Sequence, residues 1–386
     1  MKIQLSRKFF VSTVSVIALS FCLPALAAVG PPIVGDDSAT ITQTSETGST
    51  ASQNQPGQYS NAAYIDQSYG TSDIATQQQN RDSFSTPSYD FSAYGDQSIT
   101  QTSNTAAQAS QTDNSTNATQ TINQASNSSG TAAQTINAPA AWTEYNVQSA
   151  TQNGNNGGSI AQTIGLSNSP TSVASNNTQT AAQTGQTNST ITEGIDGDNA
   201  SGNSQTATET VGSANVINQT NLSSGLDNIQ TASIVYGDSN MIGQTHTGGG
   251  LTNTQTASIS YGNDNTVTQN QDSGTLNSES ATVYAGSFNT IDQYQGIGGG
   301  NNIELASVQY SSSGLIVQRQ DNSSSSGQEY ASQNSNTGAN QIGQYQGKSG
   351  NYAFVTQTGD TGNLAIQNQG GAYFSAVGNT LSPSHN

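Results

Sequence analysis

Apolar and polar residues alternate with a period of two in short stretches along most of the chain. The clearest stretches read Asn-x-Ile-x-Gln, and a second kind reads Asn-x-Gln-x-Ala-x-Ile, with mostly Ser, Thr, Asn or Asp between these positions. Residues at i, i+2 and i+4 share one face of a strand. We therefore expect strands that carry Asn, Ile, Ala and Gln on one face and water-facing residues on the other.

These stretches recur at nearly constant spacing from residue 212 onward. The first positions of successive Asn-x-Ile-x-Gln stretches, one of which has Gly in place of Asn, are 25, 25, 24, 25, 26 and 23 residues apart. Turn formers separate the two kinds of strand, for example Gly248-Gly249-Gly250. One strand–turn–strand unit cannot bury its own apolar face, whereas stacked units can. The sequence predicts an all-β fold, a β-solenoid (β-helix-like) of stacked strand–turn–strand repeats of about 25 residues.

The amides of these repeats are expected to form internal ladders. A Gln or Asn amide both donates and accepts, so identical amides in successive coils can bond along the stack. A buried amide is costly when unpaired, and the repeat supplies its partner. The predicted ladder residues are Asn215, Ile217, Gln219, Asn240, Ile242, Gln244, Asn265, Val267, Gln269, Asn289, Ile291, Gln293, Ile316, Gln318, Asn340, Ile342, Gln344, Asn351, Gln357, Asn363 and Gln367.

The N-terminal half repeats less regularly. An Ile-x-Gln core recurs there at spacings of 23 to 38 residues, and we interpret it as the same element interrupted by longer loops. Residues 81–94 and 138–145 are two such insertions, which are either plain loops or partner-contact loops. The members of this core are Ile41-Gln43, Ile65-Gln67, Ile99-Gln101, Ile122-Gln124, Ile160-Gln162 and the weaker Ile191-Glu193.

Composition argues against a globular domain and against an enzyme. Only 31% of the residues are apolar and 8% are charged, against about 45–50% and about 25% in an ordinary domain. The chain has two histidines, and His246 stands where other repeats carry an amide, while His385 lies in the tail. We expect no enzyme activity and no cofactor. The nonapeptide pattern of calcium-binding β-rolls is also missing, which leaves at most a weak cation site on the surface.

The N-terminus has the features of a secretory signal peptide. Lys2, Arg7 and Lys8 precede an apolar run over residues 9–23, and the small residues Ala25 and Ala27 mark a cleavage site after Ala27. The single cysteine, Cys22, lies inside this signal; a lipoprotein acceptor role is the alternative. The apolar run is too short to favour membrane insertion.

The rest of the chain is strongly acidic. After cleavage, three basic residues face 24 acidic ones. This balance disfavours nucleic acid and anionic membrane surfaces as partners. The predicted organisation is a signal peptide (1–27), an N-terminal segment with irregular repeats (28–95), irregular Asn/Gln-rich repeats with insertions (96–211), regular repeats (212–370) and a C-terminal tail (371–386).

Two stretches resemble the repeat of curlins, the major subunits of bacterial curli amyloid fibres. They are Asn351-x-Ala353-x-Val355-x-Gln357-x-Gly359 and Asn61-x-Ala63-x-Ile65-x-Gln67. The resemblance implies a secreted functional amyloid, an extracellular fibre at the bacterial cell surface for cell adhesion and biofilm matrix. It further implies self-assembly, a nucleator subunit, export chaperones and an outer-membrane pore. This chain is far longer than a typical curlin, and bulk subunit and nucleator both remain open.

Two other functions remain open. A monomeric β-solenoid could serve as a surface adhesin or as an ice-binding protein with outward Thr rows, although Thr-x-Thr pairs do not recur at one fixed place in the repeat. A disordered, prion-like matrix protein is the second, and the steady spacing after residue 212 disfavours it. Fibre formation by the purified chain would separate these functions.

Overall fold

The computed structural model describes residues 15–17, 26–29, 38–54, 62–79, 95–115, 117–136, 145–165, 174–196, 200–222, 225–296, 299–321, 327–334, 339–347, 352–358, 362–369, 374–377 and 380–383. Within these segments the fold is all-β, and no helix is present that could cross a membrane. The two predicted insertions lie outside these residues except for Tyr145.

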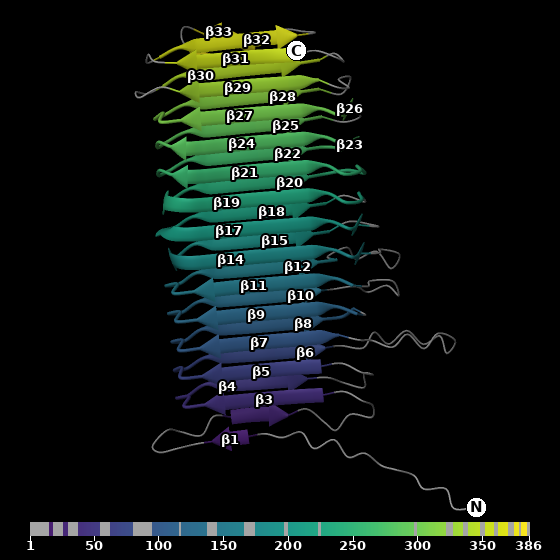
Figure 1. Cartoon of the computed structure of the whole chain (residues 1–386), viewed down its shortest axis with the longest axis vertical. Coiled ribbons are helices and arrows are strands. Elements are labelled where there is room, and N and C mark those ends of the chain that lie inside the picture. The colour runs from purple at the N-terminus through teal and green to yellow at the C-terminus, as the bar shows by residue number, and fades with distance from the viewer. Residues whose placement is uncertain are drawn as a thin grey trace, which may run out of the picture.

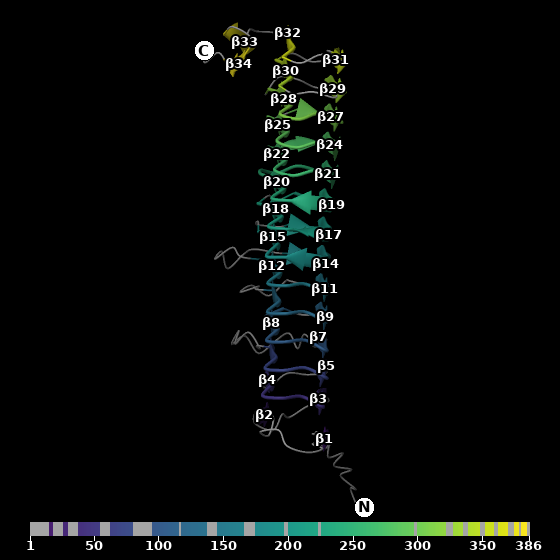
Figure 2. The same ribbon diagram turned by 90° about the vertical axis from the view of Figure 1, so that its left-hand side faces the viewer.

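The chain winds into a β-solenoid, as predicted, and its strands form two parallel sheets of 14 strands each (Figure 1). Each coil contributes one strand to the first sheet and the next strand to the second, so that the sheets face each other along the whole stack (Figure 2). The first sheet consists of β1 (Ser15–Ile17), β3 (Ser38–Thr44), β5 (Ala62–Ser68), β7 (Asp96–Thr102), β9 (Thr119–Ala125), β11 (Val147–Asn153), β14 (Thr178–Thr187), β17 (Ser204–Ser213), β19 (Ile229–Asp238), β21 (Thr254–Tyr261), β24 (Ser278–Ala285), β27 (Ile303–Gln309), β29 (Gln328–Asn334) and β31 (Tyr352–Thr358).

The second sheet is built in the same way from the alternate strands. It consists of β2 (Leu26–Val29), β4 (Thr50–Asn54), β6 (Ile74–Gln79), β8 (Gln108–Asp113), β10 (Thr131–Ile136), β12 (Ser159–Ile164), β15 (Thr190–Ile195), β18 (Val216–Asn221), β20 (Met241–His246), β22 (Thr266–Gln271), β25 (Thr290–Gln295), β28 (Leu315–Gln320), β30 (Gln341–Gln346) and β32 (Leu364–Gln369). Three short pairs complete the structure: β13 (Ala174–Ser175) with β16 (Ala200–Ser201), β23 (Gly274–Thr275) with β26 (Gly299–Gly300), and β33 (Phe374–Val377) with β34 (Thr380–Pro383).

The turns that lead from the first sheet to the second use left-handed backbone conformations. In the N-terminal coils each turn has two such residues, for example Ser103 and Ala106 at φ 54° and 53°. At the ends of β19, β21 and β24 a glycine takes over the first bend, as in Gly262 at φ 137°. A Cβ on Gly262 would collide with the carbonyl oxygen of Gly286 in the next coil, so only glycine fits there.

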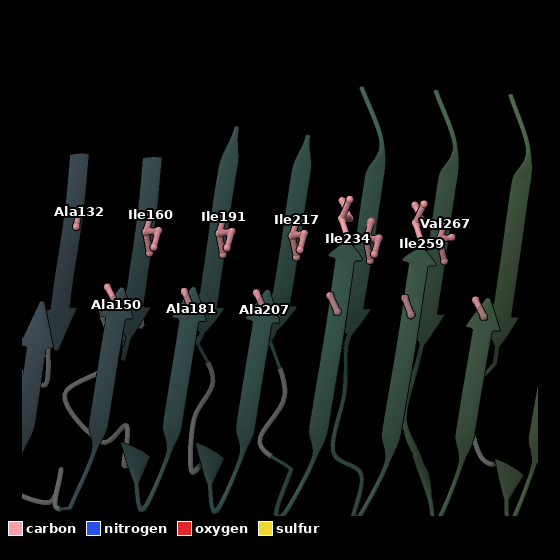
Figure 3. Packing of buried hydrophobic residues seen from close by; sticks show 14 of the residues in the cluster. Ala132, Ala150, Ile160, Ala181, Ile191, Ala207, Ile217, Ile234, Ile259 and Val267 are labelled. Atoms are coloured by element: carbon pink, nitrogen blue, oxygen red, sulfur yellow. The ribbon is translucent and has the colours of Figure 1, made fainter. Parts of the chain in front are cut away.

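The dry core is a double column of aliphatic residues in which a large residue on one sheet is matched with alanine on the other. From the coil of β3 and β4 to that of β9 and β10, isoleucine lies on the first sheet and alanine on the second. From Ala150 to Ala331 the order is reversed, and pairs such as Ala207 and Ile217 lie close together (Figure 3). This exchange keeps one large aliphatic residue opposite one alanine in each coil. In β19, β21, β24 and β27 a second large residue on the first sheet joins the core, namely Ile234, Ile259, Val283 and Val308.

The reversal corrects our interpretation of the Ile-x-Gln cores. Ile41, Ile65, Ile99 and Ile122 are in register on the first sheet, whereas Ile160 and Ile191 lie on the second sheet with Ile217. The cores are therefore two different elements of the coil. The spacing of 38 residues between Ile122 and Ile160 arises because the motif moves to the other sheet at this point, in addition to the insertion.

Outward side chains also form columns. Tyr236, Tyr261, Tyr284 and Tyr310 follow one another along the edge of the solenoid, with successive ring centroids 5.2, 6.0 and 5.4 Å apart. All four rings are exposed. Tyr236 and Tyr261 are in register, whereas the partner of Tyr261 in the next strand is Ala285 and Tyr284 lies one residue before it. The ring contacts thus continue although the position of the tyrosine shifts by one residue.

Candidate functional site: amide ladders and end coils

The predicted glutamine ladder runs through the second sheet. Each Nε2 donates to the Oε1 of the glutamine one coil further toward the C-terminus, and the members from Gln219 to Gln344 are at most 1% exposed. Each Nε2 has a second N–H, which donates to the opposite sheet; Gln269, for example, bonds to the carbonyl oxygen of Thr256 at 3.1 Å. The N···O distances are 2.7 Å for Gln219–Gln244, 2.8 Å for Gln244–Gln269, Gln269–Gln293, Gln293–Gln318 and Gln318–Gln344, and 3.5 Å for Gln344–Gln367.

The predicted asparagines lie at the start of each second-sheet strand, where they join neighbouring coils through the backbone. The Oδ1 of Asn240 accepts the backbone N–H of Asn265 at 3.1 Å, and its Nδ2 donates to the carbonyl oxygen of Gly262 at 2.8 Å. Asn265 also donates from Nδ2 to Oδ1 of Asn240 at 3.1 Å. These asparagines therefore hold the glycine turn of the next coil in place, a role that the simple ladder interpretation missed.

The structure places the remaining predicted residues as follows. The aliphatic members Ile217, Ile242, Val267, Ile291, Ile316 and Ile342 form one fully buried column, and Asn215, Asn289 and Asn340 occupy the turn position just described. Gln357 belongs to the first sheet, where it accepts from Gln333 at 3.5 Å, and it is not part of the Gln219 ladder. Asn363 and Gln367 are half-buried in the last coil, and Asn351 lies outside the described residues.

Three further ladders begin in the N-terminal coils, whose repeats are irregular in the sequence. Each begins with a glutamine and ends on a glutamate. One runs from Gln53 to Glu193 on the second sheet; on the first sheet one runs from Gln43 to Glu209 and another from Gln97 to Glu279. Aligning the two sheets separately would have revealed these ladders from the sequence.

All these ladders have the same direction, as do two shorter ones, from Gln271 to Gln346 on the second sheet and from Gln333 to Gln357 on the first. This direction leaves an acceptor at the N-terminal start of most ladders. The Oε1 atoms of Gln43, Gln97, Gln219, Gln271 and Gln333 have no hydrogen-bond partner among the described residues. Four of these starts are inside the stack. Gln43 differs because it lies in the first full coil, so its free acceptor faces the N-terminal end.

Two of the ladders end on carboxyl groups that are buried and strongly perturbed. Burial raises the pKa of Glu193 to about 8, although the hydrogen bond from Gln162 opposes the shift. Burial likewise raises the pKa of Glu209 to about 8, against the bond from Gln183. The third terminal acid, Glu279, begins a column of three buried glutamates with Glu304 and Glu329.

His246 occupies an amide row, in register with Asn221 and Gln271. It is 1% exposed, and burial lowers its pKa to about 4, so the ring is neutral at pH 7. Its Nε2 lies 2.9 Å from Nδ2 of Asn253. No group of three or more His, Cys, Asp or Glu side chains able to hold a metal ion occurs within the described segments.

The first full coil and the last coil carry the same inward pattern. On the first sheet, Ala39-x-Ile41-x-Gln43 corresponds to Ala353-x-Val355-x-Gln357. On the second sheet, Ala51-x-Gln53 corresponds to Ala365-x-Gln367. Each of these five pairs occupies the same column of the stack.

The last coil differs from its own neighbour in three of these columns. The preceding coil has Glu329, Ala331 and Ile342 where the last coil has Ala353, Val355 and Ala365. The last coil thus returns to the arrangement of the first, with the large aliphatic residue on the first sheet and alanine on the second.

The chain was also compared with known proteins. No protein-family model matches it, and no curated protein sequence matches it.

Proposed function

We propose that the mature chain is a secreted structural subunit that polymerises end to end into a curli-like cross-β fibre at the bacterial cell surface, where it serves adhesion and the biofilm matrix. The observation that carries this proposal is the match between the two end coils. In a head-to-tail stack, each inward column would continue from one molecule to the next without a change of residue class. Such a heterologous contact does not close on itself and generates filaments.

The ladder direction supports the same arrangement. The last coil would bring Gln357 over Gln43 of the next copy, in the same column. Gln357 uses one N–H for the carbonyl oxygen of Gln341 at 3.0 Å, and its second N–H would point along the stack. This N–H would supply the donor that the Oε1 of Gln43 lacks.

The two ends differ in how they are covered. At the C-terminal end, the β33–β34 pair lies beside β30 and β32, away from β31 (Figure 2). No strand follows β31 or β32 in its sheet within the described part of the chain, and an unpaired edge of this kind accepts another strand. At the N-terminal end, β1 pairs with β3 and β2 pairs with β4.

Those covering strands coincide with the predicted signal peptide. Cleavage after Ala27 would remove β1 and the first two residues of β2 (Leu26–Val29). The edge of β3 would then be free. Export would in this way create the assembly-competent end, with chaperones, an outer-membrane pore and a nucleator as the expected partners.

The test is seeded elongation of the chain that begins at residue 28, followed by electron microscopy and fibre diffraction. We expect fibres with spacings of about 4.7–4.8 Å and about 10 Å. Ala39→Arg and Ala353→Arg place a charge at the junction and should slow elongation by about tenfold or more, the effect of 1.4 kcal/mol in an activation barrier. Thr40→Arg and Thr356→Arg, which point outward on the same strands, are the matched controls.

Two results would contradict the proposal. One is normal elongation by both alanine variants, each shown by circular dichroism to retain its β structure. The other is equal slowing by the outward controls, which would indicate a general charge effect.

A second candidate, a monomeric ice-binding solenoid or surface adhesin, has one observation in its favour. Thr180, Thr206, Thr231 and Thr256 are in register on the outer face of the first sheet, which gives a longer Thr row than the sequence suggested. The row ends at Ser280. A stable β-rich monomer that forms no fibres and inhibits ice growth would favour this function.

A further inference from the structure

Three carboxyl groups lie directly over one another inside the solenoid. Glu279, Glu304 and Glu329 are in register on β24, β27 and β29 and are 0%, 0% and 1% exposed. We call these three residues the glutamate column. Neighbouring strands of a sheet are about 4.7–4.9 Å apart, so three charges in this column would repel each other strongly in a medium of low dielectric constant.

The column has few hydrogen-bond donors. The backbone N–H groups of Gln295, Gln320 and Arg319 lie near Glu279, Glu304 and Glu329 and oppose only part of the effect of burial on their pKa. Oε2 of Glu279 accepts from Gln255 at 2.9 Å, but its Oε1 has no partner. Neither oxygen of Glu304 or of Glu329 has a partner within hydrogen-bond geometry among the described residues. A buried carboxylate without donors is far less stable than the neutral acid.

The preceding coils show what this position requires. Gln205, Gln230 and Gln255 occupy the same column and donate to the carbonyl oxygens of Gly194, Thr220 and Thr245 on the opposite sheet at 2.9, 3.1 and 3.0 Å. The position is therefore built for a donor. A protonated carboxyl has one O–H to donate, whereas a carboxylate has none.

The surrounding charges do not compensate for ionisation. On the strands packed against the column, β21, β22, β25, β28, β30 and β31, the only charged residues are Asp292 and Arg319. Asp292 raises the pKa of both Glu279 and Glu304 further. Burial raises the pKa of Asp292, and Arg319 opposes this shift only in part. Arg319 also forms an ion pair with Asp321 at 3.8 Å and lies over the ring of Tyr294 at 4.4 Å.

We propose that the glutamate column is a proton-operated switch that keeps the C-terminal coils closed in acid and opens them as the carboxyls ionise. Burial raises the pKa of all three groups well above the ordinary value, and repulsion from Glu279 and Glu329 adds to the shift for Glu304. A folded-state pKa above the unfolded one means that stability is complete below about pH 4 and is lost as the pH rises through the folded value.

The opening should be local. In a solenoid each coil contacts only its neighbours, so a charged segment can open while distant coils stay closed. The N-terminal coils of β7 and β9 carry Gln97 and Gln120 in the same column. Burial raises the pKa of Asp113 on the adjacent β8 to about 6, so these coils should not respond above about pH 7. The last coil, β31 and β32, lies beyond the glutamate column and should open with it. If the proposed fibre function holds, low pH would thus also keep β31 and β32, the strands that contact the next copy, in their folded positions.

The test is hydrogen–deuterium exchange of the full chain between pH 5 and pH 9, corrected for intrinsic exchange and read by mass spectrometry. The opening constant of β24, β27 and β29 should rise about tenfold per pH unit for each carboxyl that loses its proton on opening. The slope of the logarithm of the opening constant against pH therefore counts the participating carboxyls. Above about pH 7, beyond the titration of Asp113 on β8, β7 and β9 should show a slope near zero. Exchange reports the switch whether or not fibres form, so its failure is distinguishable from failure of the fibre proposal.

The decisive variant replaces the three glutamates by the residue of the preceding coils: Glu279→Gln, Glu304→Gln and Glu329→Gln together. It should abolish the slope in β24, β27 and β29. The matched control removes the same charge from exposed turns: Asp227→Asn, Asp238→Asn and Asp264→Asn. If the triple glutamine chain does not fold, Glu304→Gln alone should lower the slope by about one, the contribution of a single proton.

Three outcomes would overturn the proposal. The slope could persist unchanged in the glutamine variants, or it could vanish equally in the aspartate control. Calcium chloride at pH 9 could also restore protection to the level at pH 5, which would make the column a cation site rather than a proton switch.

Discussion

At the residue scale, the ladders show that a single proton decides whether neighbouring polar side chains in a buried column can form a hydrogen bond. Gln162 donates to Oε2 of Glu193 at 2.6 Å, and the next member of the column is Gln219. Oε1 of Glu193 and Oε1 of Gln219 both lack a partner among the described residues. Two acceptors face each other at this step unless Glu193 carries a proton, which its pKa of about 8 provides at neutral pH.

We therefore expect Glu193→Gln to stabilise the solenoid in a pH-dependent way. The glutamine would donate to Gln219 at every pH, whereas Glu193 does so only when protonated. Because the folded pKa is raised, the stability contributed by the proton is lost as the pH rises through about 8. The free energy of unfolding should increase by about 1–3 kcal/mol at pH 9, the cost of an unpaired buried polar group, and by less at pH 5.

Urea denaturation followed by circular dichroism at both pH values measures this difference. Asp238→Asn, an exposed turn residue, is the control for loss of one charge. Equal stabilisation at pH 5 and pH 9 would show that Glu193 is not the titrating group.

At the element scale, the strand pairs are held by columns rather than by a thick core. Each inward residue of β22 (Thr266–Gln271) has an equivalent in β20 and in β25. Val267 contributes packing, and Gln269 makes one bond to the opposite sheet and two along the ladder. Stability is thus shared between aliphatic burial and amide hydrogen bonds at adjacent positions of the same strand.

Gln269→Leu should destabilise the coil by about 2–4 kcal/mol, because it leaves a donor of Gln244 and the acceptor of Gln293 unpaired in the interior. Thr266→Ser, an outward change on the same strand, should alter stability by less than about 0.5 kcal/mol. Hydrogen exchange of β20, β22 and β25 would show where the loss occurs. Similar exchange in both variants would mean that the ladder contributes little.

At the scale of the whole molecule, stacking decides the properties of the two ends. Interior coils satisfy each other, whereas the first and last coils each lack a neighbour. The end coils share a residue pattern that none of the last interior coils has, with Ala353, Val355 and Ala365 replacing Glu329, Ala331 and Ile342. A molecule of this kind is complete only when another copy lies against it.

We expect the signal-bearing precursor to elongate seeds at least about tenfold more slowly than the chain from residue 28, since β1 and β2 occupy the edges of β3 and β4. Dye-monitored seeded kinetics with equal concentrations of the two chains would measure this ratio. The chain from residue 28 with Ala39→Arg should resemble the precursor. Equal rates for precursor and processed chain would show that these strands do not block assembly.

The sequence alone determined the strands, the repeat length and the faces of the strands in the regular half. A period of two is a local property, and the Gln219 ladder repeats at nearly constant spacing, so both are visible without coordinates. The solenoid followed because such strands cannot bury their inward face singly.

Only the tertiary structure decided which residues share a column. Ile122 and Ile160 carry the same local motif on different sheets, and Glu279 and Asp292 look alike in the sequence although one is buried and the other half-buried. The match between the end coils likewise appears only when strands more than 300 residues apart, β3 and β31, are placed in one register. Local periodicity fixes the face of a side chain, but the alignment of coils separated by variable turns is fixed by their packing.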